Sequence, residues 1–541
     1  MRRIVQLILA ASVIVLAAFQ VSAEPVKVSI WSAITGVGQE GKTEVSYSDT
    51  PIGNMVSGIN GVDWQIQYTQ NSNFANAFNL RLASDDWPEA INMPSATLMP
   101  MDKLQKLIDA KVIVPLDKYY NNPKYPYINM IPKKVIDYWR MPDGHIYNFP
   151  TGVYADPKQA YGYWAAAVWA VRPDYLAAVN MTTSDLKTIA GVEKFLRAVK
   201  AKGLKNSDGL PVYPISSGEN IGLADLILNT FGVSTVGQGF DMVGSKMVNV
   251  RDNPQTKAAL AWLNSLWADG IIDPEALSQK NDTLREKMMG KRVAMMASFA
   301  WPYWQTVTAG ITPVTDMAFL EYPSAPGAAK SGVNVTYNPN GSAGGLLITK
   351  NAKNPEAIVN LVNETWKDFD PKMSADAKWE HQLTLEYGNR GVFWDWDPKL
   401  GKPYYVTLRD MAAAGGDYNK IAAIGFSMNP IIVQGNDSNY FTANLKDVLD
   451  WIFRMHKFYY NKPNVAPERP FDSLKMPAEG LWNKNAEVLG RLDLEYKAKL
   501  ISAPKGGFEA VWKDYQNQLE QQGNWSKVRA EWEAAYKAQV K

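Results

Sequence analysis

Aromatic side chains are concentrated in the segment SFAWPYW, which contains Phe299, Trp301, Tyr303 and Trp304. The apolar, strand-like run 293–297 directly precedes them. A large aromatic ring offers a flat apolar surface to a ligand such as a sugar, but most such rings fill hydrophobic cores. The segment therefore predicts either a binding platform or ordinary core packing, and Phe299 fits the core better than the other three.

Acidic residues form two clusters that a glycosidase could use. WDWDP contains Asp395 and Asp397, and SDDWPE contains Asp85, Asp86 and Glu89. A glycosidase needs two carboxyl groups facing each other across a cleft. Acidic residues in loops are more often solvated or bonded to nearby backbone. We therefore expect these carboxylates to be non-catalytic.

The sequence lacks the histidine, serine and cysteine patterns of several enzymes and metal sites. The three histidines, His145, His381 and His456, include no pair spaced for a helical zinc site, and there is no H-E-x-x-H. No G-x-S-x-G elbow occurs. The absence of cysteine excludes disulfides, thiol catalysis and Cys-ligated metals. His145 follows a Pro-Asp-Gly turn signal, so we expect an exposed turn residue, and we expect no enzyme activity, cofactor or metal.

The first 23 residues have the pattern of a secretory signal peptide. Arg2 and Arg3 precede an apolar run at 4–19, and Val21-Ser22-Ala23 places small residues before a cleavage point. A membrane anchor is the alternative, but the run is short for a bilayer span. No cysteine follows Ala23, which argues against a lipoprotein. We expect a soluble periplasmic protein that is cleaved after Ala23.

The composition of the remaining chain excludes some partners. Removing residues 1–23 from the 541 leaves 518 residues, which is long enough for two or more domains. Without Arg2 and Arg3 the chain has 54 basic and 54 acidic side chains, so its net charge gives no attraction to nucleic acid or to an anionic membrane. The 19 Trp and 26 Tyr residues instead favour surfaces that contact a ligand.

Short apolar runs alternate with stretches of helical periodicity, which predicts an α/β protein. The stretch 161–172 is apolar enough for a strand in a buried sheet or for one that crosses between two lobes. Strands are expected at 26–31 and 90–93, and a helix is expected at 73–84 with Phe74, Phe78 and Leu82 on one face. A second helix is expected to be capped by Ser184 and to end at Gly203, and a third to begin at Asn354 and Pro355 with Ile358, Leu361, Val362 and Trp366 facing inward. The last forty residues are expected to be helical, with Val528, Trp532 and Tyr536 on one stripe.

Several stretches together resemble the family 1 extracellular solute-binding proteins of ABC importers, the group that contains maltose-binding protein. The resemblance covers about residues 26–370 in the order of the family, and the C-terminal helices are similar to those of long oligosaccharide-binding and alginate-binding members. The matching stretches are NLRLASDDWPEAINM (79–93), LIDAKVIVPLDKYY (107–120), MPDGHIYNFPTGV (141–153), WAVRPDYLAAVNM (169–181), SLWADGIIDPEAL (265–277), MMGKRVAMMASFAWPYW (288–304) and GGLLITKNAKNPEAIVNLV (344–362).

The resemblance implies a two-lobed periplasmic-binding-protein fold of type II, with interleaved lobes, crossing strands and extra C-terminal helices. The N-terminal lobe is expected to comprise residues 24–155 plus 320–370. The C-terminal lobe is expected to comprise residues 156–319 plus 371–541. A ligand is expected between the lobes, which close around it by a hinge motion.

The resemblance also implies which residues contact the ligand. In the family, an aromatic segment after the strand equivalent to 293–297 stacks on sugar, so the platform interpretation is favoured for Trp301 and Trp304. The weaker candidates are Tyr303, Trp87, Asp86, Trp164, Trp394, Trp396 and Gly345. Trp394 and Trp396 lie on one side of the chain if it is extended there. Packed aromatics are the alternative for Trp87, Trp164, Trp394 and Trp396.

One region departs from the family pattern. Long members often have a calcium loop after the helix that ends here near residue 203, but this chain has GLKNSDGLPVYP, in which only Asn206 and Asp208 are plausible oxygen ligands. A calcium site needs six or more oxygens, several of them anionic. The metal is therefore not expected.

These observations predict the substrate-binding subunit of an ABC importer, capturing a sugar or oligosaccharide and delivering it to the permease. We expect a monomer whose partners are the ligand and the membrane subunits. The neutral net charge does not exclude a uronate as the ligand, because Arg81, Arg140 or Arg172 could bind its carboxylate locally. The alternatives are a secreted enzyme or adhesin that acts on polysaccharide, or a binding protein for a non-sugar solute such as a peptide.

Overall fold

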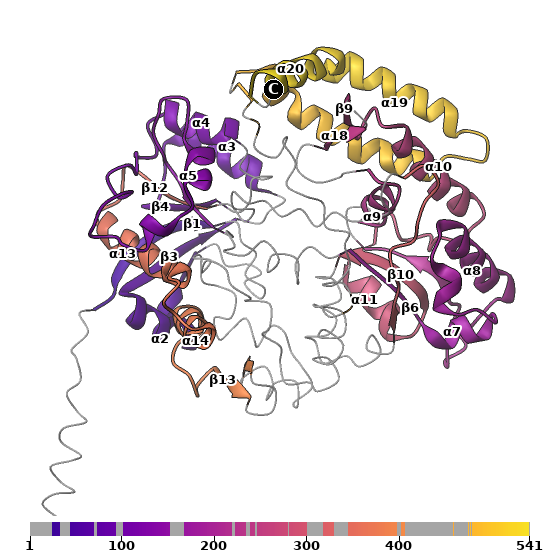
Figure 1. The fold of residues 1–541 in the computed structure, drawn as a ribbon, viewed down its shortest axis with the longest axis horizontal. Helices are drawn as coiled ribbons and strands as arrows, with labels where there is room; N and C mark the ends of the chain where they lie inside the picture. The colour runs from indigo at the N-terminus through magenta and orange to yellow at the C-terminus, as the bar shows by residue number, and fades with distance from the viewer. Residues whose placement is uncertain are drawn as a thin grey trace, which may run out of the picture.

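The structure is a computed structural model of the 541-residue chain. It describes residues 24–32, 44–69, 73–93, 101–151, 167–218, 222–233, 239–243, 246–279, 281–299, 317–328, 345–397, 402–405, 458, 474, 476–477 and 479–539. Two mixed sheets with helices packed on them confirm the expected α/β class, and Figure 1 shows the elements of the two sheets on opposite sides of the molecule.

The first sheet has six strands in the spatial order β2-β3-β1-β4-β12-β5. β1 runs parallel to β3 and β4, whereas β12 is antiparallel to β4. β12 follows all strands of the second sheet in the chain, so the chain leaves the first sheet and returns to it. The strands expected at 26–31 and 90–93 are confirmed. The bounds are β1 (Val26–Ser32), β2 (Glu44–Ser46), β3 (Val62–Tyr68), β4 (Ala90–Met93), β5 (Phe149–Pro150) and β12 (Gly345–Ile348).

Helices around this sheet complete a first hydrophobic core, whose members lie within residues 28–149 and 346–366. The expected helix at 73–84 is α3, with Phe74 and Phe78 fully buried and Leu82 half-buried. Asn354 and Pro355 begin α13 as expected. The helical elements are η1 (Tyr47–Asp49), α2 (Pro51–Asn60), α3 (Phe74–Ser84), α4 (Met101–Asp109), η3 (Ile128–Met130), α5 (Lys133–Trp139), α13 (Pro355–Thr365), η7 (Lys367–Phe369) and α14 (Ala375–Tyr387).

The second sheet has four strands in the order β11-β6-β10-β7. β10 is parallel to β7 and antiparallel to β6. β6 is the described part of the apolar stretch 161–172, and it lies between two other strands with Val168 to Val171 fully buried, so it belongs to a buried sheet. The bounds are β6 (Ala167–Val171), β7 (Tyr213–Ser216), β10 (Val293–Phe299) and β11 (Ala318–Phe319).

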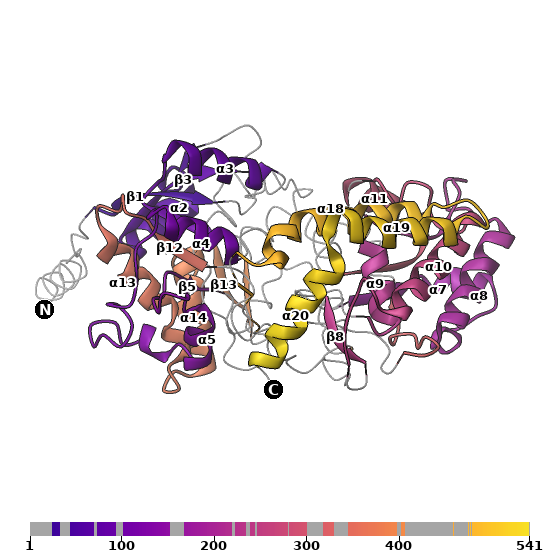
Figure 2. The same cartoon turned by 90° about the horizontal axis from the view of Figure 1, so that it is seen from above.

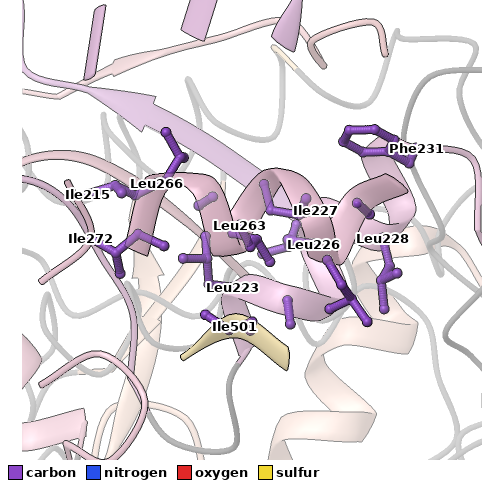
Figure 3. Close-up of a cluster of buried hydrophobic side chains, with 14 of the residues drawn as sticks. Ile215, Leu223, Leu226, Ile227, Leu228, Phe231, Leu263, Leu266, Ile272 and Ile501 are labelled. Carbon is purple, nitrogen blue, oxygen red and sulfur yellow. The ribbon is translucent and has the colours of Figure 1, made fainter. Parts of the chain in front are cut away.

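A second core surrounds this sheet and shares no residue with the first. Figure 3 shows apolar side chains of α9 and α10 meeting Ile215, Ile272 and, from the C-terminal region, Ile501. The other elements here are α7 (Pro173–Ala178), η4 (Thr183–Leu186), α8 (Ile189–Lys202), α9 (Gly222–Thr230), β8 (Phe240–Val243), β9 (Lys246–Asn249), α10 (Pro254–Ala268) and α11 (Asn281–Met289).

The cap expected at Ser184 is wrong. Thr182 and Asp185 form a capping box for the short η4, and the main helix α8 begins later, where Thr188 Oγ1 accepts a hydrogen bond from the Gly191 amide at 3.1 Å. Several Thr, Ser and Asp residues lie close together here, and any of them can cap a helix. The end of the helix is as expected, because Gly203 has φ 59°, a conformation that glycine adopts without strain.

The C-terminal helices α18 (Leu481–Ile501), α19 (Phe508–Gly523) and α20 (Trp525–Gln539) confirm the expected helical end of the chain. Val528 and Trp532 are buried in the second core, and Tyr536 packs against it. Figure 2 shows α18 and α19 lying along this half of the molecule, whereas α20 runs through the middle of the view. Arg251, which follows β9, joins them through two hydrogen bonds to Asp493 of α18, at 3.1 and 2.6 Å.

Helix α14 packs on the first half of the molecule. It contacts α2, and Asn60 Nδ2 donates a hydrogen bond to the Leu385 carbonyl at 3.1 Å. Residues 371–541 were expected in the second lobe, so these contacts favour placing α14 in the first lobe instead. The lobe boundaries otherwise stay a prediction. A hairpin of β13 (Trp394–Asp397) and β14 (Lys402–Tyr405) follows α14.

A mostly buried histidine joins α14 to the segment before it. His381 Nδ1 lies 3.0 Å from Asp368 Oδ1, and its Nε2 lies 3.7 Å from Glu364 Oε2. Burial lowers the pKa of His381, but the interactions with Asp368 and Glu364 outweigh it, so that its net pKa is raised. Burial also raises the pKa of Asp368. The folded protein therefore holds protons at His381 and Asp368 more tightly than the unfolded chain does, whereas the interaction with His381 lowers the pKa of Glu364.

We expect stability to fall as the pH rises through the raised pKa of His381. A histidine with a raised pKa contributes stability that is complete below its unfolded value of about 6.5 and is lost above its folded value. Melting temperatures measured from about pH 6 to pH 9 should show this loss in the wild type and a flatter profile in His381→Gln. Equal profiles for the wild type and His381→Gln would contradict the prediction.

Candidate functional site

The strands of the first sheet bring several residues to one edge. The parallel strands β3, β1 and β4 end at Tyr68, Ser32 and Met93. β12 is antiparallel and begins at the same edge, since Gly345 pairs with Met93 and with Pro150 of β5. The carboxyl edge of a sheet is where open α/β proteins bind their ligands. This edge is the candidate binding site of the first half of the molecule.

The Asn148 carboxamide is the most unusual group at this edge. Its side chain has no exposed surface, and neither Oδ1 nor Nδ2 has a hydrogen-bond partner in the part of the chain that the structure describes. It lies against Gly345, where a Cβ atom would meet Asn148 Oδ1 at 1.8 Å, so any other residue at 345 would displace the amide. Thr151, nearby in sequence and 8% exposed, also has an unpartnered hydroxyl. Buried polar groups of this kind are rare and call for a functional explanation.

Further neutral polar groups lie along the same edge. Ser32 and Asn92 are buried on adjacent strands, and Asn92 Nδ2 donates to Ser32 Oγ at 3.5 Å. Tyr68 is half-buried, and its hydroxyl lacks a partner among the described residues. Burial raises the pKa of Tyr68 above its ordinary value, so the phenol stays neutral and can donate a hydrogen bond. The edge therefore offers uncharged donors and acceptors.

Aromatic rings pack against one another near this edge of the sheet. Trp31 stacks on Phe74 with ring centroids 4.7 Å apart, and Trp87 meets Trp31 edge-on at 5.9 Å. Trp87 is 4% exposed, which favours the packed-aromatic alternative for this predicted ligand contact. Asp86, its neighbour, is exposed, and its carbonyl accepts a hydrogen bond from Arg81.

The two predicted ligand contacts in the hairpin, Trp394 and Trp396, differ in burial. β13 is extended, as the sequence analysis assumed for Trp394 and Trp396. Trp394 is fully buried and its Nε1 donates to the Gly388 carbonyl at 2.8 Å, which favours core packing. Trp396 is half-buried and stays a candidate. Asp395 between them pairs with Arg390 at 2.8 Å.

Trp164, Trp301, Tyr303 and Trp304 lie outside the described residues, as does the side chain of Phe299. Their roles stay predictions. The described strand before the aromatic segment, β10, is parallel to β7 and reaches Phe299. The chain therefore enters the segment from the carboxyl end of a strand in the second sheet, the position at which a ligand contact is expected.

A buried polar network holds the carboxyl end of β7. Lys287 Nζ lies 2.6 Å from Asp273 Oδ2, which also accepts a hydrogen bond from Ser216 Oγ at 2.6 Å. Gln279 closes the network, accepting from Lys287 and donating to Ser216, both at 2.8 Å. All four side chains are buried. The sequence gives no sign of this network, since its members come from β7, the 269–279 loop and α11 and share no motif.

Asp85, Glu89 and Asp395 of the acidic clusters are engaged in structural contacts. Glu89 accepts hydrogen bonds from the backbone amides of Ser29 and Lys353, and Asp85 pairs with Lys350 at 2.6 Å. His145 lies in the expected turn, with Nδ1 3.1 Å from Asp117. Among the described residues there is no group of three or more His, Cys, Asp or Glu side chains arranged to hold a metal, and no helix is long and apolar enough to cross a bilayer.

The loop at 203–214 uses its best potential calcium ligand for its own fold. Asn206 Oδ1 accepts hydrogen bonds from the amides of Asp208 and Leu210, and its Nδ2 donates to the Gly290 carbonyl at 2.7 Å. We expect that a chelator leaves the melting temperature unchanged and that added calcium does not raise it, because one remaining carboxylate cannot hold the ion. A drop in melting temperature with chelator that calcium reverses would contradict this prediction.

Neither a known protein-family profile nor a curated protein sequence matches this chain. Several solved structures do match the chain. An alginate-binding protein, AlgQ2, has 17% identity and a TM-score of 0.69, covering 96% of this chain and 99% of its own. The Streptococcus pneumoniae ABC-transporter substrate-binding protein FusA, solved with kestose, has 18% identity and a TM-score of 0.68, covering 95% and 99%. An HMO-binding solute-binding protein from Bifidobacterium longum infantis has 14% identity and a TM-score of 0.64, covering 96% and 100%. The chain therefore has the two-lobed fold of these proteins.

Proposed function

We propose that this chain is the extracytoplasmic substrate-binding subunit of an ABC importer and that it captures a sugar or oligosaccharide. The fold supports this proposal, because the structures it resembles along nearly their whole length are named as binding proteins for alginate, kestose and HMO. The protein would be exported to the periplasm after cleavage behind Ala23, carry no lipid, act as a monomer and deliver its ligand to the permease subunits.

The single observation that carries the proposal is the set of buried, unpartnered polar groups at the carboxyl edge of the first sheet. A buried amide without a partner costs free energy of about 1–3 kcal/mol. A polyhydroxylated ligand supplies the missing donors and acceptors. Binding without turnover fits this edge better than catalysis, because Asp85, Glu89 and Asp395 are engaged in contacts within the protein.

We propose that the two halves are lobes that close on the ligand by a hinge motion. Separate hydrophobic cores support this, since each half can move as a unit. Small-angle scattering should show compaction on addition of a ligand that binds. An unchanged profile at saturating ligand would count against closure.

A thermal-shift screen with sugars and oligosaccharides tests the proposed function, because a ligand that binds only the native state raises the melting temperature. Stabilisation by an oligosaccharide that is recovered intact supports a binding protein. Recovery of cleaved sugar would show an enzyme, and stabilisation by peptides alone would show a different solute.

A further inference from the structure

We infer that Asn148 is a specificity-determining contact that recognises an uncharged pair of neighbouring hydroxyl groups on the ligand. This inference rests on the proposed function, and it narrows the ligand from any sugar to one that presents two neighbouring hydroxyl groups, and not a carboxylate, at this position. It starts from the position and burial of the Asn148 carboxamide, which the sequence analysis did not single out.

The register of the sheet directs the amide toward the binding edge. Leu346 pairs with Phe149 and Gly345 with Pro150, so Asn148 lies opposite Leu347, two positions further from the edge than Gly345. Its side chain nevertheless reaches Gly345, so it leans along the strand toward the edge. The missing side chain of Gly345 makes room for it.

The chemistry of the amide matches a pair of hydroxyls. Oδ1 accepts a hydrogen bond and Nδ2 donates, and neither finds a partner in the described chain. Two neighbouring sugar hydroxyls can donate one hydrogen bond and accept the other. A carboxylate only accepts, so it would leave Oδ1 unpaired. The amide has no exposed surface, so a ligand reaches it only when the groups that cover it move aside.

The arginines considered for a uronate are used elsewhere. Arg81 lies over the ring of Trp31 at 5.2 Å, on the β3 and β1 side of the sheet, with β4 and β12 between it and β5. Arg140 bonds to the Gly144 carbonyl and lies 3.5 Å from Asp117. Arg172 follows the end of β6 in the second sheet. Its backbone amide donates a hydrogen bond to the Ala294 carbonyl near the start of β10, so it lies at the edge of the second sheet opposite to the one where β10 ends. None of these three cations faces the corner formed by Gly345 and Asn148.

The test compares Asn148→Leu with Asn264→Leu. Asn264 is also a buried asparagine, but its Nδ2 donates to the carbonyls of Ile501 and Ala503. Asn148→Leu should keep or raise the melting temperature without ligand, since it removes an unpaired polar group, whereas Asn264→Leu should lower it. A drop for Asn148→Leu as large as that for Asn264→Leu would overturn the inference, because it would show that the amide already has its partners.

Calorimetry provides the second measurement, with kestose, nystose, maltotriose and cellotriose as neutral probes and trimannuronate and trigalacturonate as charged ones. We expect a neutral probe to bind and its Kd to rise at least about tenfold in Asn148→Leu. Asn264→Leu, measured below its melting temperature, should keep the wild-type Kd. An unchanged Kd in Asn148→Leu for every probe that binds overturns the inference and leaves the proposed function standing. If no probe binds, the proposed function fails and the inference fails with it.

Discussion

Replacing Asp273 with alanine is expected to lower the free energy of unfolding by about 3 kcal/mol or more. The change leaves the ammonium group of Lys287, a side chain only 5% exposed, without its fully buried counter-charge. Removing one partner of a buried ion pair typically costs about 3–5 kcal/mol, because the other charge stays buried without compensation. Glu275, whose carboxylate lies 2.7 Å from Lys287, limits the loss to the lower part of this range.

The double variant Asp273→Ala with Lys287→Met separates the ion pair from simple packing. It leaves no buried charge unpaired, so it should lose less stability than Asp273→Ala alone. Denaturant unfolding of both single variants and the double variant gives the coupling energy. Asp137→Ala, which removes the exposed partner of Lys133, is the control and should cost less than about 1 kcal/mol. Equal losses for Asp273→Ala and Asp137→Ala would contradict the expected role of the network.

Trp301→Ala is expected to weaken ligand binding at least about tenfold, equivalent to about 1.4 kcal/mol, while it folds nearly normally. The expectation rests on the position of the aromatic segment, which the chain enters from the carboxyl end of β10. A platform ring is partly exposed without ligand, so its removal leaves no cavity in a core. Trp304→Ala should have the same effect.

Trp394→Ala is the matched control for the aromatic prediction. This ring is fully buried and hydrogen-bonded to Gly388, so its loss should cost about 3–5 kcal/mol of stability. Calorimetry and a melting curve on each variant distinguish the two roles. If Trp301→Ala melts as far below the wild type as Trp394→Ala and keeps its affinity, the ring belongs to a core and the predicted site is misplaced.

Elements with local signals could be predicted from the sequence. The spacing of Phe74 and Phe78 predicted α3, and Asn354 with Pro355 predicted the start of α13. Gly203 marked the end of α8. Each signal acts within one or two turns of the chain, where hydrogen bonds and apolar periodicity are set by neighbouring residues. The predicted start of α8 was wrong because Thr182, Ser184 and Thr188 all have a hydroxyl group that can cap a helix.

The candidate site depended on contacts between distant residues. Asn148 becomes notable only when β12 brings Gly345 beside it, nearly two hundred residues later in the chain. Ser216, Asp273 and Lys287 meet through the packing of a strand, a loop and a helix. Sequence alone also leaves open whether a tryptophan such as Trp87 is a platform or packed. Composition and local patterns thus determined the fold class and many of its helices and strands. Only the tertiary structure decided which polar groups lie buried without partners, because burial and pairing depend on what folding brings together.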